Sequence, residues 1–292
     1  MSALVAVLIA DPQVGLDPAV VSAVEEATGG APRWLDDKDA AEFVLHDEPS
    51  WDDQLRPLLG PARVDLAIVP AANRRKRLLI ADMDSTIIEQ ECIDELADEV
   101  GKRDEVSAIT ERAMRGEIDF ADALRERVAT LRGLPTTAVD RVLLERIHIR
   151  AGALELVRTM RANGAHTMLI SGGFTHFTRA IATEVGFDKN RANTLNVAAD
   201  AFDGSVADPI LGGEAKLIAL NEATAAYGIT TDDALAVGDG ANDLAMIEAA
   251  GLGVALHAKP AVAARADVSI RYGDLTSLLY LQGYTSDKFV RS

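Results

Sequence analysis

Two aspartates, Asp82 and Asp84, stand two residues apart directly after the apolar run 78–81. Two carboxylates about 4 Å apart repel each other by about 4 kcal/mol at an effective dielectric constant near 20. A fold keeps such a pair if a cation neutralises it or if one member stays protonated. The pattern therefore indicates a metal site or a nucleophile beside a general acid. A solvated turn is the alternative, because Asp, Ser and Thr favour turns.

Three further polar clusters have residue types that suit phosphate chemistry. Ser171-Gly172-Gly173 offers a hydroxyl and glycine N–H groups between an expected strand and an expected helix, which is an anion-binding arrangement. Lys216 stands early in an expected helix, where a cation is unfavourable unless it faces an anion. Glycines flank Asp239 and let a ligand approach closely, and Asn242 and Asp243 follow. Each cluster alone is explained by a turn or a surface lysine, but the four in this order are a stronger signal.

The expected elements place the four clusters at one edge of a sheet. Strands are expected at 78–81, 166–170, 234–237 and 252–255, with helices at 152–163, 174–185, 214–227 and 242–250. This alternation predicts an α/β fold, a doubly wound parallel sheet with right-handed crossovers. Such sheets bind ligands outside the carboxyl ends of their strands, which is where the clusters fall.

Two other units accompany this sheet. Between 89 and 149 the apolar period changes to about 3.6, which predicts helices at 89–100, 103–114, 119–131 and 136–148 as an α-helical cap. Residues 1–72 show the order β-α-β-β-α-β of a small α+β ferredoxin-like domain. That domain is either a packing or dimerisation module or a small-ligand sensor of the ACT type. The catalytic core is then expected to comprise 77–88 and 150–292, with 89–149 as the cap.

Two polar segments receive structural interpretations. A stretch that contains Asp203-Gly204 is expected to form a β-hairpin. The basic run Arg74-Arg75-Lys76-Arg77 is interpreted as a solvated linker at the domain boundary, because four residues without aromatic neighbours make a weak nucleic-acid patch. The five histidines have no metal-ligand spacing and are expected to be structural.

Composition narrows the classes of partner. The chain has 292 residues, and 46 acidic residues against 29 basic ones give a net charge of −17. Such a surface repels phosphate backbones and anionic lipid, which disfavours nucleic-acid and membrane partners. The single cysteine, Cys92, excludes an intramolecular disulfide framework and fits a reducing compartment. The apolar N-terminus is short and lacks preceding basic residues, so a strand is expected there and not a signal peptide. A cytoplasmic protein is expected.

With these motifs in this order, the chain resembles the haloacid dehalogenase (HAD) superfamily and, within it, the phosphoserine phosphatase family. The resemblance spans about residues 77–285. Asp82-Met83-Asp84-Ser85-Thr86 is similar to that family's form of the first motif, and the cap is similar at Glu91, Met114, Phe120 and 124–128. It implies Mg²⁺-dependent hydrolysis of O-phospho-L-serine to L-serine and phosphate, the last step of serine biosynthesis.

The resemblance also implies roles for the residues of the sheet. Asp82 would be the nucleophile that forms an aspartyl-phosphate, and Asp84 the general acid and then the base. Mg²⁺ would bind Asp82, the backbone carbonyl of Asp84 and Asp239. The other phosphoryl oxygens would contact Ser171, Gly172 and Lys216, with Asp243 orienting Lys216 and Asn242 beside the phosphate.

In the cap, the resemblance implies recognition of a zwitterion. Glu91 suits the ammonium group of serine, and the planar fork of Arg127 suits its carboxylate. Met114 and Phe120 would form an apolar wall that excludes water.

Two other functions stay open. An aspartyl-phosphate could pass its phosphoryl group to an alcohol such as homoserine, which would make the enzyme a phosphotransferase. The N-terminal domain could instead sense an amino acid beside a vestigial hydrolase. A membrane ion pump shares the phosphorylated aspartate, but the absence of an apolar run of about 18 residues argues against it. A homodimer is left open.

Overall fold

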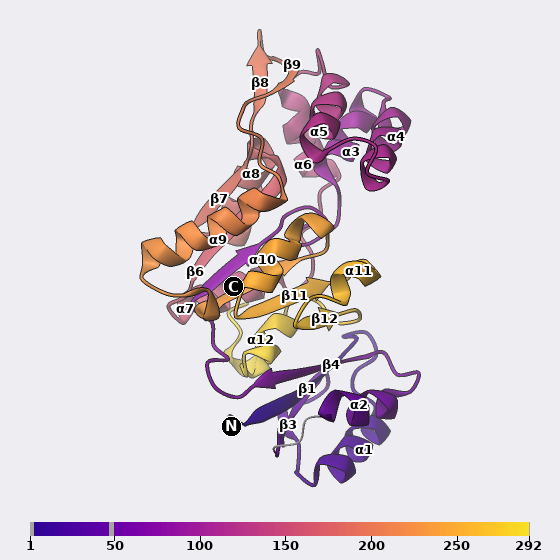
Figure 1. The fold of residues 1–292 in the computed structure, drawn as a ribbon, viewed down its shortest axis with the longest axis vertical. Coiled ribbons are helices and arrows are strands. Elements are labelled where there is room, and N and C mark those ends of the chain that lie inside the picture. The colour runs from indigo at the N-terminus through magenta and orange to yellow at the C-terminus, as the bar shows by residue number, and fades with distance from the viewer. Residues whose placement is uncertain (1–2, 47–49, 292) are drawn as a thin grey trace.

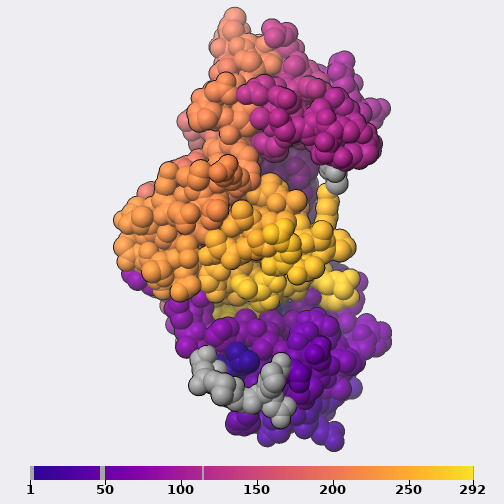
Figure 2. Space-filling model, viewed as in Figure 1, coloured from indigo at the N-terminus to yellow at the C-terminus, as the bar shows by residue number. Residues whose placement is uncertain are grey.

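The computed structural model describes residues 3–46 and 50–291. It is an elongated molecule in which three parts follow one another along the long axis (Figure 1). A small N-terminal unit occupies one end, a parallel sheet with its helices occupies the middle, and a helical cap with a β-hairpin beside it occupies the other end. Figure 2 shows the same succession on the surface, where the magenta cap and the orange hairpin lie together.

The central sheet is parallel, as predicted, and has six strands in the order β12-β11-β10-β5-β6-β7. The strands are β5 (Leu78–Ala81), β6 (His166–Phe174), β7 (Lys189–Asn193), β10 (Ala234–Gly238), β11 (Leu252–Leu256) and β12 (Val268–Ile270). The polar strand β7 and the three-residue strand β12 were not predicted. Both lie at edges of the sheet, where a strand needs no long apolar run.

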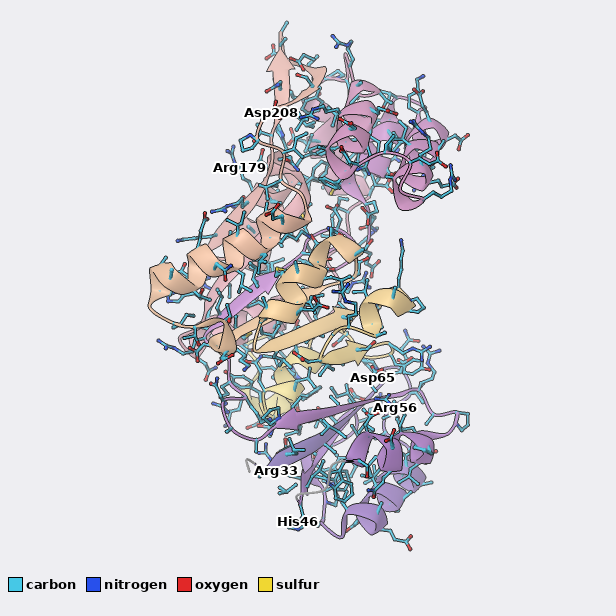
Figure 3. The ribbon with its side chains drawn as sticks, in the orientation of Figure 1. Arg33, His46, Arg56, Asp65, Arg179 and Asp208 are labelled. Carbon is cyan, nitrogen blue, oxygen red and sulfur yellow. The ribbon has the colours of Figure 1, made fainter. Side chains whose placement is uncertain are left out.

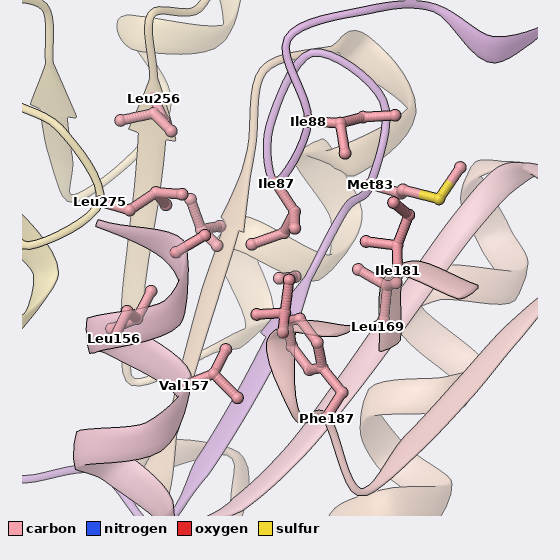
Figure 4. Close-up of a cluster of buried hydrophobic side chains, with 14 of the residues drawn as sticks. Met83, Ile87, Ile88, Leu156, Val157, Leu169, Ile181, Phe187, Leu256 and Leu275 are labelled. Carbon is pink, nitrogen blue, oxygen red and sulfur yellow. The ribbon is translucent and has the colours of Figure 1, made fainter. Parts of the chain in front are cut away.

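Helices cover both faces of this sheet, which confirms the doubly wound fold. Successive residues of β5 point to opposite faces, so that Leu79 belongs to one buried cluster and Ile80 to another. The first face is covered by α7 (Ala153–Ala162) and α8 (Thr175–Val185), and Figure 4 shows Leu156 and Val157 of α7 among the buried side chains there. The second is covered by α9 (Gly213–Tyr227) and α10 (Leu244–Ala249).

The predicted cap helices are present as α3 (Cys92–Glu99), α4 (Arg103–Met114), α5 (Phe120–Ala129) and α6 (Thr137–Glu145). The two chain segments that enter and leave the cap meet at an antiparallel bridge between Ile88 and Ile149. The cap therefore joins the core through two adjacent strands of chain.

A β-hairpin from the core, β8 (Leu195–Ala198) and β9 (Ala201–Val206), packs on helix α5 of the cap. The predicted hairpin is present, and Asp203-Gly204 lies within its second strand. The turn lies at Ala199 and Asp200, whose φ angles of 51° and 63° match the paired left-handed residues of a tight hairpin turn. Gly204 lies within β9, where a Cβ atom would come within 2.9 Å of Arg132 Cβ, so this glycine serves contact with the cap.

The N-terminal unit is the expected ferredoxin-like sandwich. Its antiparallel strands β1 (Leu4–Ala10), β2 (Arg33–Asp36), β3 (Ala40–Leu45) and β4 (Val64–Pro70) follow the order β2-β3-β1-β4. Helix α1 (Pro18–Thr28) and helix α2 (Trp51–Leu55) cover one face. The expected helix 51–58 continues after α2 as a 3-10 turn over 56–59.

The second face of the N-terminal sheet is buried against the core. Alternate residues of β1 belong to different clusters: Leu8 packs with α1 and α2, whereas Val7 and Ile9 join the main core cluster. That cluster includes α12 (Ser277–Leu281), which follows α11 (Pro260–Ala263) near the C-terminus. The N-terminal unit thus shares a continuous apolar core with the parallel sheet.

The basic run 74–77 is solvated only in part: Arg75 and Arg77 are exposed, as the sequence suggested, whereas Arg74 and Lys76 contact the rest of the protein. Arg74 forms an ion pair with Glu42 at 2.8 Å and donates to the Leu281 carbonyl at 3.1 Å. Lys76 is buried and donates to the Asp232 carbonyl at 2.7 Å. These contacts join the N-terminal sheet to the core. Arg74 and Lys76 supply the hydrogen-bond donors that the carboxylate and the carbonyls at this boundary require.

Among the described residues, every helix is too short or too polar to cross a lipid bilayer.

Candidate active site

The site forms where strands β5, β6 and β10 end side by side. Strand β5 lies between the other two, with Ala81 paired to Leu169 of β6 and to Val237 of β10. Asp82 follows β5 directly, Ser171 lies near the end of β6, and Asp239 follows β10. Parallel strands bring their carboxyl ends to one edge, so residues far apart in sequence meet there.

Lys216 is the buried centre of the site. Its Nζ lies 2.7 Å from Asp82 Oδ1 and 2.5 Å from Asp243 Oδ1, and its side chain is 1% exposed. Burial alone would lower the pKa of Lys216, but the two carboxylates beside it raise that pKa above its usual value. The ammonium therefore stays charged. Asp243 Oδ2 accepts a hydrogen bond from the Gly240 N–H at 3.0 Å, which fixes the carboxylate that orients the lysine.

Three carboxylates gather around this ammonium. One oxygen each of Asp82, Asp239 and Asp243 lies within 4.8 Å of the others. Burial and then the Asp243 carboxylate raise the pKa of Asp239. A single lysine does not neutralise three carboxylates, and oxygen donors at this spacing suit a hard divalent cation. Asp243 belongs to the cluster although the sequence assigned it only to Lys216.

The Asp84 carboxylate binds Ser171 of the core and the start of the cap. Its Oδ2 accepts a hydrogen bond from Ser171 Oγ at 2.9 Å, and its Oδ1 accepts one from the Cys92 N–H at 2.8 Å. The Gly173 N–H donates to Ser171 Oγ at 2.8 Å. The Asp84 carboxylate is therefore held between the core and the first residue of helix α3. The family resemblance assigned the backbone carbonyl of Asp84 to the metal, and not its carboxylate.

Glu91 and Arg127 bring opposite charges to the cap side of the site. Glu91 Oε1 accepts a hydrogen bond from Ser85 Oγ at 2.7 Å. Glu91 is an exposed residue, but neighbouring protein atoms partly desolvate its carboxylate. This desolvation, followed by repulsion from the Asp84 carboxylate, raises the pKa of Glu91 to about 7. Desolvation lowers the pKa of Arg127, and the nearby carboxylates of Asp94 and Glu91 oppose that shift. Within the described residues, the structure records no ion pair for Arg127.

Phe120 joins the cap to the glycine loops of the core. A Cβ atom added at Gly172 or at Gly212 would lie 3.2 Å from the Phe120 ring. The ring thus packs on the backbone at two glycines, and a side chain at either glycine would displace it. Met114 ends helix α4, but its side chain lies outside the part of the chain that the structure describes.

Asn242 lies in the short turn after Asp239, and its backbone carbonyl is close to Gly213 at the start of α9. A Cβ atom at Gly213 would come within 2.9 Å of that carbonyl oxygen. The glycine lets the helix that carries Lys216 approach the loop after β10. The sequence prediction of a residue beside the phosphate stays a prediction.

Two residues of the site received no role from the sequence. Thr86 donates to Asp239 Oδ1 at 3.2 Å and so links the loops after β5 and β10. The buried amide of Asn193 donates to the carbonyls of Gly172 and Leu211 at 2.8 and 3.1 Å, and accepts from the Leu211 N–H. Thr86 stands in the first motif, which was a usable signal. Asn193 lies in a polar edge strand, where no sequence pattern marks it.

Comparison with known proteins shows related chains. The family model of the haloacid dehalogenase-like hydrolases matches residues 79–248. The phosphoserine phosphatase of Albidiferax ferrireducens is 47% identical over 70% of this chain and 89% of its own length. That of Archaeoglobus fulgidus is 44% identical over 74% of this chain and 63% of its own. A HAD family hydrolase of Salmonella enterica serovar Typhi superposes with a TM-score of 0.86 and 29% identity, over 98% of this chain and 99% of that one.

Proposed function

The chain belongs to the haloacid dehalogenase-like hydrolases and is a hydrolase of phosphoric monoesters, and from this premise we propose that its substrate is O-phospho-L-serine. The observation that carries the proposal is the pair of charges at the cap, Glu91 and Arg127, above a buried lysine–carboxylate centre. Serine presents one ammonium and one carboxylate beside its phosphate. The two cap charges have the signs that such a zwitterion requires, and the relatives named above are phosphoserine phosphatases.

In the first step the Asp82 carboxylate attacks phosphorus while the bond from phosphorus to the seryl oxygen breaks. Asp84 gives its proton to that oxygen, and an aspartyl-phosphate forms on Asp82. In the second step Asp84 takes a proton from water as the water oxygen attacks phosphorus and the Asp82 carboxylate leaves. Hydrogen bonds from Ser171 in the core and from the Cys92 N–H at the start of the cap hold the Asp84 carboxylate in place.

The phosphoryl group meets donors that the fold fixes beforehand. Lys216 Nζ, the Ser171 hydroxyl and the Gly172 N–H converge on the space beside Asp82 in this proposal, with Asn242 at its margin. Donors that need no reorganisation stabilise the charge that develops on the phosphoryl oxygens. The contact between Asp243 and Lys216 holds the ammonium in place for this task.

Mg²⁺ fits the carboxylate cluster, and Asp82, Asp239 and the backbone carbonyl of Asp84 would hold it. When bound, the ion would neutralise the crowded carboxylates and polarise a phosphoryl oxygen. The three carboxylate oxygens within 4.8 Å of one another support this assignment, because one lysine ammonium does not neutralise three carboxylates. Asp243 is occupied by Lys216 and Gly240, so we assign it to support and not to the ion.

Phosphate release from O-phospho-L-serine tests the proposal. We expect metal-dependent release that EDTA stops and that Asp82→Asn abolishes. The rate of release from phosphoserine should exceed the rates from a panel of phosphorylated sugars. Release from sugars without release from phosphoserine would contradict the roles of Glu91 and Arg127. Product analysis with homoserine present separates water from an alcohol as the acceptor. A cytoplasmic location, a role in serine synthesis and the absence of nucleic-acid partners stay predictions, and a homodimer stays open.

A further inference from the structure

Arg150 stands where the chain returns from the cap to the core, and its guanidinium contacts the loop that follows the two aspartates. Its Nε donates to the Thr86 carbonyl and its Nη2 to the Ser85 carbonyl, both at 3.0 Å. The planar fork of arginine suits two neighbouring acceptors, whereas lysine would reach them only as a point charge. Two successive carbonyls of one loop are thus held by one side chain.

This loop carries much of the site. Ser85 has a φ of 55°, a left-handed conformation that is uncommon for a residue with a side chain. Its hydroxyl donates to Glu91, and the next residue, Thr86, donates to Asp239. The carbonyl of Asp84, proposed as a metal ligand, directly precedes Ser85. Contacts that hold Ser85 and Thr86 therefore fix groups that face both the metal and the substrate.

A histidine in turn orients Arg150. His257 follows β11, and its Nε2 lies 2.8 Å from the Gly273 carbonyl oxygen. A carbonyl only accepts, so Nε2 carries the proton, and Nδ1 of the neutral ring accepts the hydrogen bond from Arg150 Nη1 at 3.1 Å. The ring thus fixes the third nitrogen of the guanidinium while the other two hold the loop.

The same hydrogen-bond path reaches the N-terminal unit. Asp65 of strand β4, which Figure 3 labels where that unit meets the core, is buried. Its carboxylate accepts hydrogen bonds of 2.9 Å from the N–H groups of Arg271, Tyr272 and Gly273. It therefore shapes the turn whose last residue, Gly273, receives the bond from His257. The path runs from Asp65 through His257 and Arg150 to Ser85 and Thr86.

We infer that Arg150 is a positioning residue for the loop 83–91, that His257 orients it, and that Asp65 of the N-terminal unit anchors the path. The inference deepens the proposed function, on which its kinetic part rests. It gives the N-terminal unit a role in supporting the site, because Asp65 of its strand β4 fixes the turn that binds His257. Replacement of a residue that hydrogen-bonds to a metal ligand without touching the metal commonly lowers metal affinity or activity by about 10- to 100-fold.

The first test is the exchange of backbone amides with deuterium in the full-length, metal-free protein. In Arg150→Met we expect peptides from 83–91 to exchange faster, while peptides from β10 and α9 stay as in the wild type. Arg161→Met is the matched control: Arg161 also binds a carbonyl, of Gly186, and a carboxylate, of Asp188, but lies away from the loop. This measurement needs no substrate, so its outcome is independent of the proposed function.

The second test is kinetic and uses phosphoserine and an aryl phosphate well below the unfolding temperature. Arg150→Met should raise the Mg²⁺ concentration for half-maximal activity by about 10- to 100-fold on both substrates, and Arg150→Lys by less. Excess Mg²⁺ should recover part of kcat, which general unfolding would not allow. If wild-type protein does not hydrolyse phosphoserine, the proposed function fails, whereas exchange at 83–91 still judges the positioning role.

Two comparisons test the rest of the path. His257→Gln and His257→Met share the strain of a left-handed backbone, with φ of 47° at that position, so their difference reports the hydrogen bonds. Because glutamine can donate and accept hydrogen bonds, the backbone amides of 83–91 should exchange more slowly in His257→Gln than in His257→Met. Asp65→Asn should accelerate exchange at 271–273 and at 83–91. Unchanged exchange and Mg²⁺ dependence in Arg150→Met would overturn the inference. Change in Arg150→Met without any in Asp65→Asn would overturn the anchoring role of the N-terminal unit.

Discussion

The hydroxyl of Ser171 donates a 2.9 Å hydrogen bond to Asp84 Oδ2, which joins the residue proposed to bind the phosphoryl group to the residue proposed to move the proton. The other Asp84 oxygen accepts from the Cys92 N–H at the start of the cap. Both oxygens of the acid–base group are therefore fixed before substrate binds. Binding of a phosphate would offer Ser171 a second acceptor, so the two proposed roles share one hydroxyl.

Ser171→Ala should impair chemistry as well as phosphate binding. The variant removes a hydrogen bond to a charged group, worth about 1.5–3 kcal/mol, so kcat/KM should fall by about 10- to 100-fold on phosphoserine and on an aryl phosphate alike. Inhibition by inorganic phosphate should weaken too. Ser205→Ala in the hairpin removes a serine bonded to Asp203 and is the control. Unchanged phosphate inhibition would count against the role of Ser171 as a phosphate ligand.

Arg127→Ala should act on the serine part of the substrate. We expect a KM for phosphoserine higher by about 10-fold or more, from the loss of a hydrogen bond to a charged group, and a smaller effect on an aryl phosphate without a carboxylate. Arg125→Ala on the same helix is the control, because Arg125 pairs with Asp122 and Asp208. Equal losses on both substrates would refute the carboxylate-binding role.

Glu91 should give the binding of phosphoserine a pH dependence. The pKa of Glu91 is raised to about 7 by desolvation and by Asp84, so at pH 6 most of these carboxyls are protonated and cannot attract the ammonium. KM should therefore fall as pH rises through about 7 and then level off. Glu91→Gln should remove this inflection while it keeps the titration of the substrate's own phosphate. An inflection that persists in Glu91→Gln would assign it to another group.

The meeting of the polar clusters could be predicted from the sequence because parallel strands impose it. Once Asp82, Ser171 and Asp239 are each placed after a strand, the sheet brings them to one edge. The expected bounds of β5 agree with the structure because its four residues form one apolar run, and those of most helices agree because their apolar periods end at glycines. The fold class and the family resemblance are confirmed.

What the sequence could not give depends on contacts between distant segments. The hairpin could be predicted from its composition, but the role of Gly204, which lies against Arg132 of the cap, could not. The structural contacts of Arg74 in the basic run could not be predicted, because its acceptor, the Leu281 carbonyl, lies more than 200 residues away. Arg150 and Asn193 bind backbone carbonyls, which carry no sequence signal. Local patterns cannot identify such partners.

Asp239→Asn should separate stability from activity. The pKa of Asp239 is raised by burial and by Asp243, so the folded protein binds this proton more tightly than the unfolded chain does. The carboxylate therefore lowers stability at neutral pH, and that cost shrinks as pH falls through the raised value. The asparagine variant, which can still accept the hydrogen bond from Thr86, should raise the metal-free Tm at pH 7.

The same variant should lose the response to metal. Ligands that bind only the folded state raise Tm, so Mg²⁺ should stabilise the wild type and should stabilise Asp239→Asn much less. Phosphatase activity should fall with it. Asp208→Asn is the control, because Asp208, which Figure 3 labels, is an exposed carboxylate that pairs with Arg125 and is not one of the three clustered aspartates. Thermal unfolding with EDTA and with Mg²⁺ measures both effects. An equal Mg²⁺-induced rise in Tm in Asp239→Asn would remove Asp239 from the metal site, and a lower metal-free Tm would show that its carboxylate is compensated by the protein.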